Sequence, residues 1–433
     1  MAPQGRLVQD FVRTLSRTKV DCCISGQAAY LKHVLTHWPV PSLYTLYISL
    51  YTCCMLFQKM SGKRTTTSMV SPSAALTLWM WGGGNTYGQL GLGDVIPRSS
   101  PVQVGVLNTW QTPAQTATLA TTLIKVDGTL WAWGVNQYGT LGLGDVLHRS
   151  SPVQVGTLAT WSKVCMGWFG QGASLGLKID GTLWGWGNNA RGGVGDGTVI
   201  PRSSPAQVGT LATWSQIATG LYHSLATKTD RTLWAWGRND GKGSGALGLG
   251  DGAHRSSPVQ VGTLAAWSQI MAGYAHSLAL KTDGTLWMWG GNTHGQLGLG
   301  DAAYRSSPVQ VGTLATWSSV LNGSGFHSFA IKTDGTLWAW GRNDLGQLGL
   351  GNAIYRSSPV QVGTHNMWLK AGAGKTHSAA LKTDGTLWVW GSGSNGYLGQ
   401  GDTVGRSSPV QVGTLATWVG IGVNYHHIVA LRT

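Results

Sequence analysis

Residues 306–352 read SSPVQVGTLATWSSVLNGSGFHSFAIKTDGTLWAWGRNDLGQLGLGN, and this stretch decides the fold because the chain repeats it. Its pentapeptide LWAWG belongs to a motif, LWxWG, that occurs seven times at intervals of 50 to 53 residues. A second motif, RSSPxQVG, also occurs seven times, and each unit carries one further Trp. Self-similarity at a fixed period of this length is typical of stacked repeat architectures.

Each unit is expected to form four short strands. Pro308–Gly312 alternates apolar and polar side chains, which predicts a half-exposed strand, and a second strand starts near Trp317. The third strand is HSFAIK at 327–332, and Asp334–Gly335 after it is a strong hairpin signal. The fourth, TLWAWG at 336–341, is apolar on both faces, which indicates burial between two neighbouring sheets.

Four-stranded antiparallel sheets of this kind bury their faces only by stacking on copies of themselves. The sequence therefore predicts an all-β fold, a seven-bladed β-propeller over residues 71–433. The repeat region opens at Leu76 without its HSLALK-like strand, and the chain ends with that strand at 427–433. We expect the C-terminal strands to close the ring by pairing with the first repeat strand, so that the last three strands and the first one form a single blade.

The motifs WGxNxxGQLGLGD, RSSPVQVG and GxxHSLALKxDGxLWxWG strongly resemble those of the regulator of chromosome condensation repeat family. The resemblance covers residues 76–433 and implies the same propeller fold. The family's founding member is a chromatin-bound exchange factor for a small GTPase, which contacts the GTPase with a β-hairpin inserted in one blade. The even spacing of the units here leaves no room for such an insertion, and the largest local excess is the Gly-rich stretch Gly241–Ala246.

Two polar positions recur in register and could suggest sites. Five histidines share one position, which Ala120 and Ala173 fill in two other units: His223, His276, His327, His377 and His427. Equivalent positions in successive blades point in related directions around the axis rather than at one ion, which favours structural hydrogen bonding over a metal site. In six units an Asp ends the GLGD loop and an Arg follows, a pattern that predicts an ion pair within the blade or a turn cap.

No catalytic motif stands out from the repeats. GxSxG, HExxH and paired carboxylates are absent from the sequence, and no GK[ST] follows the glycines. We therefore expect no enzyme activity, no catalytic residues, no metal and no cofactor.

The segments before each HS strand differ most between units, and we expect these loops to share one end of the ring. Aromatic residues in such loops are favoured anchors at protein interfaces. The alternative is drift in loops under little constraint. The hypothesis is that a tryptophan-rich, glycine-rich scaffold binds a protein partner through this face, with these residues as the binding set: Trp168, Phe169, Tyr222, Tyr274, Phe326 and Tyr425.

Other partners are weighed against that hypothesis. A glycan is a further class of partner, and an exchange-factor or chromatin-associated role is the alternative function. The net charge of +14 invites nucleic acid as a partner, but the charge is spread by the repeat rather than clustered. Nucleic acid and a small GTPase are therefore less favoured.

Residues 1–70 do not belong to the repeat and are expected to be poorly ordered or marginally membrane-associated. Residues 33–58 carry no charged residue, but Pro39, Pro41 and many hydroxyl groups make a membrane anchor marginal. Two other interpretations stay open: an organellar presequence with basic residues, which Asp10 weakens, and translation that truly starts at Met60.

Overall fold

The computed structural model describes residues 76–106, 109–111, 119–167, 172–240, 245–321 and 325–433. Residues 72–433 form one compact unit, and residues 1–71 fall in a separate one that lies outside the described residues. The expected domain boundary at residue 70 and the membrane hypothesis for residues 33–58 stay predictions for that reason. In the described part of the chain there is no helix long and apolar enough to span a membrane.

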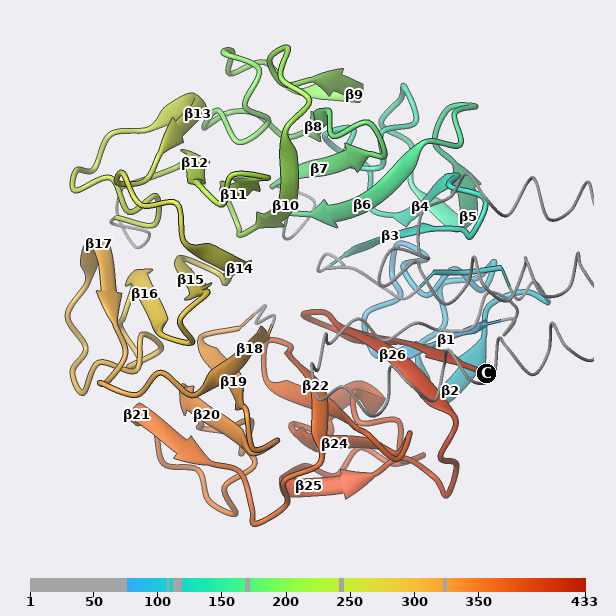
Figure 1. The fold of residues 1–433 in the computed structure, drawn as a ribbon. Coiled ribbons are helices and arrows are strands. Elements are labelled where there is room, and N and C mark those ends of the chain that lie inside the picture. The colour runs from blue at the N-terminus through green and yellow to red at the C-terminus, as the bar shows by residue number, and fades with distance from the viewer. Residues whose placement is uncertain (1–75, 107–108, 112–118, 168–171, 241–244, 322–324) are drawn as a thin grey trace, which may run out of the picture. The chain divides into compact units, whose positions relative to one another are not determined.

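Seven antiparallel sheets stand around a central axis as the blades of a propeller, as the sequence predicted (Figure 1). Six blades have four strands. In the blade of β3, an isolated bridge between Trp110 and Lys125 stands where the other blades have their first strand. In order along the chain, from the inner strand to the outer where the blade is continuous, the blades consist of β3 (Ala120–Ile124), β4 (Leu130–Gly134) and β5 (Arg149–Gln154); β6 (Trp161–Met166), β7 (Ala173–Lys178), β8 (Leu183–Gly187) and β9 (Arg202–Gln207); β10 (Trp214–Thr219), β11 (His223–Lys228), β12 (Leu233–Gly237) and β13 (Arg255–Gln260); β14 (Trp267–Ala272), β15 (His276–Lys281), β16 (Leu286–Gly290) and β17 (Arg305–Gln310); β18 (Trp317–Leu321), β19 (His327–Lys332), β20 (Leu337–Gly341) and β21 (Arg356–Gln361); β22 (Trp368–Ala373), β23 (His377–Lys382), β24 (Leu387–Gly391) and β25 (Arg406–Gln411); and the closing blade β26 (Trp418–Val423), β27 (His427–Arg432), β1 (Thr77–Gly82) and β2 (Arg98–Gln103).

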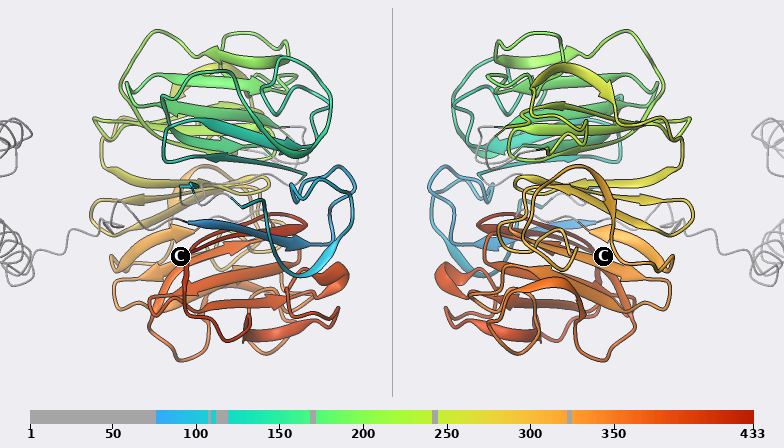
Figure 2. Two further views of the ribbon diagram at one scale, coloured as in Figure 1. Left: turned by 90° about the vertical axis from the view of Figure 1, so that its right-hand side faces the viewer. Right: turned by 90° about the vertical axis from the view of Figure 1, so that its left-hand side faces the viewer.

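The closing blade joins the two ends of the repeat region. β1 pairs with β27 along its whole length, and β26 and β2 complete the sheet on either side, so that the first strand lies among the last ones (Figure 2). The predicted closure is confirmed, but each end contributes two strands, and the expected division of three and one is wrong. The reason is that each RSSPxQ strand hydrogen-bonds to the LWxWG strand before it, so β25 belongs with β24 to the preceding blade.

The outer strand also begins earlier than the alternation at Pro308–Gly312 predicts. β17 starts at Arg305, which pairs with Gly290, and ends at Gln310, which pairs with Trp287. Proline is tolerated here because the strand is the outer edge of its sheet and needs no N–H on that side. Gly312 has a φ of +64°, so the chain turns there instead of continuing the strand.

The turn between the second and third strands follows from its sequence, KTDGT. In the blade of β15, the carboxylate of Asp283 accepts hydrogen bonds from the backbone N–H of Thr285 at 2.9 Å and from its hydroxyl at 2.6 Å. Gly284 has a φ of +82°, which glycine adopts without strain. The indole N–H of Trp287 then donates to the Thr285 hydroxyl at 2.9 Å, so the turn also orients the first Trp of LWxWG.

The hydrophobic core lies between neighbouring blades. The second Trp of every LWxWG motif is completely buried, and each apolar cluster combines residues of two adjacent blades. A buried Trp removes about 200 Å² from water, which corresponds to roughly 5 kcal/mol. Because the blades bury their faces only against one another, the ring is the smallest unit that completes its own core.

Candidate binding face

The connections between the first and second strands of the blades lie at one end of the ring. Strands alternate in direction within each blade, so these connections and those between the third and fourth strands share that end, while the Asp–Gly turns lie at the other. Backbone hydrogen bonds join loops of neighbouring blades, from Leu221 N–H to Tyr274 O at 3.3 Å and from Lys375 N–H to Tyr425 O at 3.4 Å. We call this set the inner hairpin face: residues 167–172, 220–222, 273–275, 322–326, 374–376 and 424–426.

An aromatic cluster crosses the boundary between two blades on this face. The rings of Tyr274 and Phe326 lie 4.6 Å apart between centroids at an interplanar angle of 42°. His294 packs edge-on against Phe326 at 5.0 Å and against Tyr355 at 5.6 Å. Tyr274 and Phe326 are half-buried, so each ring still presents part of its surface to solvent. The structure thus brings together two of the predicted binding residues with two that the sequence did not single out.

The other predicted residues lie on the same face but are presented differently. Tyr222 is half-buried, and the guanidinium of Arg238 lies 5.4 Å from its ring centroid. Tyr425 is only 7% exposed, with the Lys375 ammonium 4.9 Å from its ring, and burial raises the pKa of its phenol to about 12. Tyr425 therefore offers little surface of its own. Trp168 and Phe169 lie outside the described residues.

The residues that sequence reasoning missed come mostly from the connections between the third and fourth strands. Arg238 and Arg342 follow β12 and β20 directly, and each is paired with an aspartate two residues later: Arg238 with Asp240 at 2.6 Å and Arg342 with Asp344 at 2.5 Å. The signal that could have found these residues is topological, because antiparallel alternation places both sets of loops at the same end.

The recurring histidines have a structural role, as the sequence predicted. Each His ring that has a hydroxyl opposite it in the next blade forms a hydrogen bond through Nε2: His223 with Ser277 at 3.0 Å, His276 with Ser328 at 3.1 Å, His327 with Ser378 at 2.9 Å and His427 with Thr121 at 3.2 Å. Burial lowers the pKa of His223 to about 4 and the pKa of the other three to about 3. Within the described ranges no group of three His, Cys or Asp side chains could hold a metal ion.

The junction between the β23 blade and the closing blade differs from the others. His377 has no hydrogen-bond partner for either ring nitrogen, because Ile428 stands where other blades have a hydroxyl residue. Instead the ring of Tyr397 stacks on His377 at 4.9 Å, and its hydroxyl bonds to Nδ1 of His426 at 2.8 Å. Burial, and then Lys375, lowers the pKa of His426 to about 4.

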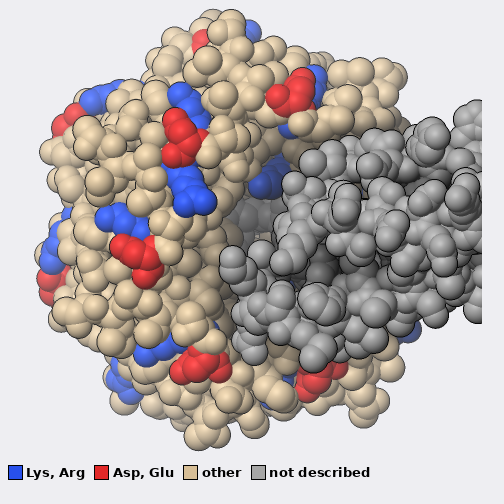
Figure 3. Space-filling view, in the orientation of Figure 1, with Lys and Arg blue, Asp and Glu red and all other residues tan. Residues whose placement is uncertain are grey.

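The predicted ion pair within each blade is also confirmed. In all six units with the GLGD aspartate, the following Arg contacts it at 2.5 to 2.9 Å. In the seventh, Asn352 replaces the aspartate. On the side of the molecule seen in Figure 3, basic and acidic side chains lie next to one another, and the described residues form no broad patch of one sign there.

Comparison with known proteins agrees with this architecture. A family model described as an RCC1-like domain matches residues 73–430. The ultraviolet-B receptor UVR8 of Arabidopsis thaliana is 30% identical over 294 residues, which are 65% of this chain and 64% of the receptor, a little under two thirds of its length.

Two solved structures share the fold. Human WBSCR16 is 22% identical with a TM-score of 0.72, and the match covers 83% of this chain and 99% of that one. Prp20p from Saccharomyces cerevisiae is 21% identical with a TM-score of 0.71, covering 83% and 92%. The family match over nearly all of the repeat region confirms the resemblance found in the sequence motifs. The chain belongs to the RCC1-like domain family.

Proposed function

We propose that this propeller is a non-enzymatic scaffold that binds a protein partner through its inner hairpin face. The observation that carries the proposal is the stacking of Tyr274 on Phe326 across a blade boundary, with both rings partly open to solvent. Half-buried aromatic rings held by a rigid scaffold are favoured interface anchors, because little side-chain entropy is lost when a partner covers them.

The surroundings of these rings fit a protein partner. Arg238 and Arg342 stand beside the aromatic cluster, and both are oriented by aspartates of their own loops. An apolar centre with oriented Arg side chains at its edge matches the composition of protein interfaces. The relatives support the same class of function: UVR8 is named as a receptor, and the structure of Prp20p is titled for its binding properties to Gsp1p and histones.

The alternative is an exchange factor or a chromatin-associated regulator. The recurring basic residues speak against a nucleic-acid surface, since six of the outer arginines are engaged by the aspartate of their own loop. Nucleotide release from a panel of small GTPases separates the two functions. An exchange factor should raise the release rate at least tenfold, and a scaffold should leave it unchanged.

The proposal itself is tested by affinity capture with quantitative mass spectrometry. The bait is the full chain, compared with a variant carrying alanine at Trp168, Phe169, Tyr222, Tyr274, Phe326 and Tyr425. The matched control carries alanine at three exposed apolar residues of the opposite end: Val106, Val126 and Ile179. Partners that the control retains and the face variant loses support the proposal. If every captured partner stays bound to the face variant, the inner hairpin face is excluded.

A further inference from the structure

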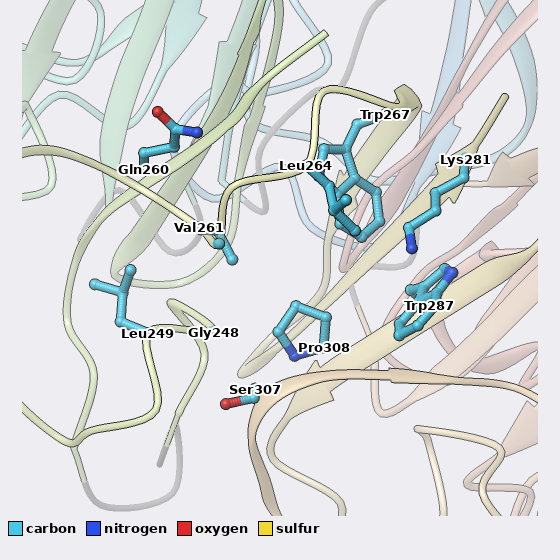
Figure 4. A pocket seen from close by; sticks show the side chains of 11 residues that line it. Gly248, Leu249, Gln260, Val261, Leu264, Trp267, Lys281, Trp287, Ser307 and Pro308 are labelled. Carbon is cyan, nitrogen blue, oxygen red and sulfur yellow. The ribbon is translucent and has the colours of Figure 1, made fainter.

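A second kind of site lies between the blades, away from the inner hairpin face. The same pocket occurs at four junctions, with cavity volumes of about 270, 290, 390 and 480 Å³. At the junction shown in Figure 4, Trp267, Lys281, Trp287 and Pro308 come from one blade, and the preceding blade contributes the rest, including Val261. Lys281 is the last residue of β15, whereas the hairpin loop precedes the first residue of that strand, so the pocket and the inner hairpin face lie at opposite ends of it.

The ammonium of Lys281 is the unusual group in this pocket. The side chain is 9% exposed, and its Nζ lies 3.7 Å from the ring centroid of Trp287 and 5.2 Å from that of Trp267. The nearby carboxylate of Asp283 is engaged by Thr285. Among the described residues, no oxygen accepts a hydrogen bond from this ammonium. Indole faces stabilise the positive charge but satisfy none of its three N–H donors, and Figure 4 shows Nζ directed toward the open space beside Pro308.

The walls of the pocket are otherwise suited to an apolar surface. Leu264 stands at the mouth with 55% of its surface exposed, and Pro308 and the Trp287 ring are half-buried. Gln260 and Ser307 add amide and hydroxyl groups at the edge. A ligand that fits has a flat apolar face to lie against these rings and an oxygen, preferably anionic, to accept from Lys281. A carboxylated sugar has both, because its C–H face is apolar and its edges carry hydroxyl and carboxylate oxygens.

The repetition of the pocket favours a ligand that repeats as well. A cation lies over the first Trp of LWxWG in every blade: six lysines, with Nζ at 3.6 to 3.8 Å from the ring centroid, and Arg432 at 4.9 Å in the closing blade. Equivalent pockets at successive junctions present the same chemistry several times, and a polymer of identical units gains avidity from that arrangement, which a peptide of varied sequence does not. We propose that the pockets between the blades bind the carboxylated sugar units of an acidic polysaccharide.

The probe is an oligogalacturonate long enough to reach two junctions, titrated into the full chain by calorimetry, with its methyl ester as the neutral counterpart. The free acid should bind at least tenfold more tightly than the ester, because only the free acid presents a carboxylate to Lys281. Equal binding of the two would overturn the proposal. Poly-aspartate that bound as tightly as the oligogalacturonate would overturn the assignment to a sugar.

Two variants with the same change of charge locate the site. One places aspartate at the exposed leucines of the four pocket mouths: Leu158, Leu211, Leu264 and Leu314. The other places aspartate at four equally exposed valines that line none of these pockets: Val95, Val146, Val199 and Val404. The leucine variant should lose at least tenfold in affinity, and the valine variant should stay within twofold of the wild type. Equal losses would show binding to overall charge and contradict the proposal.

A third variant tests the cation itself while leaving the surface leucines intact. It carries methionine at the lysines of the four pockets: Lys178, Lys228, Lys281 and Lys332. Methionine keeps the apolar stem against the indole rings, so the melting temperature should change little, while the preference for the free acid over the ester should disappear. A preserved preference would overturn the role of these lysines.

Discussion

The Nε2 atom of His327 lies 2.9 Å from the hydroxyl oxygen of Ser378 in the next blade. Ser378 donates its hydroxyl proton to the carbonyl of Gln347 at 2.8 Å, and the same carbonyl accepts from the indole N–H of Trp390 at 2.9 Å. One buried chain of hydrogen bonds therefore joins a strand residue of one blade, two residues of the next and the loop between them. The residues that recur in the repeat are those that connect one blade to its neighbour.

This connection should appear as an energetic coupling. In a double-mutant cycle, His327→Ala and Ser378→Ala should couple by about 1 kcal/mol in the free energy of unfolding, the usual worth of a buried hydrogen bond. His223→Ala with Ser378→Ala is the matched control, because these two residues belong to blades that are not neighbours. Its effects should add within about 0.3 kcal/mol. Additive effects for the first pair, measured by denaturant unfolding, would contradict the bond.

Acid should destabilise the propeller well before its aspartates titrate. The pKa of His276, His327, His377 and His427 is about 3 and that of His223 about 4, against about 6.5 for an unfolded chain. Because burial depresses the folded pKa, the stabilisation is complete above about pH 6.5 and is lost as the pH falls toward 4. Each of these histidines should contribute up to about 1.4 kcal/mol per pH unit within that window. Urea unfolding at pH 7.5, 6.0 and 5.0 measures the slope, and a free energy that stays constant down to pH 5 would refute the buried neutral histidines.

The glycines of GLGLGD are explained by space as well as by conformation. Gly298 has a φ of +69°, and a Cβ atom there would lie 2.8 Å from Nε1 of the buried Trp340. Gly312 has nearly the same φ, +64°, with nothing near its missing Cβ. Gly312→Ala should therefore cost about 1 kcal/mol for the backbone conformation alone, and Gly298→Ala about 3 kcal/mol because the indole cannot move away. Equal losses of stability in the two variants would show that the contact with Trp340 is unimportant.

Ring closure depends on strands from both ends of the repeat region. Deletion of residues 419–433 removes β27 and nearly all of β26, which leaves β1 without its inner neighbours. We expect this deletion to open the ring and lower the melting temperature sharply, because the faces of two blades lose their cover. Deletion of residues 1–71, which contain none of the strands, should leave the melting temperature of the propeller unchanged. An unchanged melting temperature after the C-terminal deletion would refute the closure.

Sequence reasoning predicted most of the frame because the repeat itself expresses it. LWxWG, the Asp–Gly turn and the recurring His and Asp–Arg positions each report a local requirement, and the structure satisfies each within one blade or one junction. Periodicity alone does not say where a blade begins, however. A unit read from Ser306 joins strands of two blades, and only the pairing of Arg305 with Gly290 assigns the outer strand to the blade before. That is why the closing blade divides two and two.

The candidate sites were less predictable, for a different reason. The diversity of the loops pointed to Tyr274 and Phe326, but the burial of Tyr425 and the position of His294 depend on how neighbouring blades pack. The lysines between the blades were visible as a constant position six residues before the first Trp of LWxWG. Their contact with two indole rings arises only when strands distant in the unit come together, and sequence spacing does not report it.

The central functional claim is that the inner hairpin face contacts a protein partner, and site-specific photo-cross-linking tests it most directly. Benzoylphenylalanine at position 274 keeps an aromatic ring on the face, and the same residue at position 179 probes an exposed site at the opposite end of the ring. With partner present, irradiation should give a cross-linked product from position 274 and none from position 179. Cross-linking from position 179 alone, or equally from both positions, would contradict the assignment of this face.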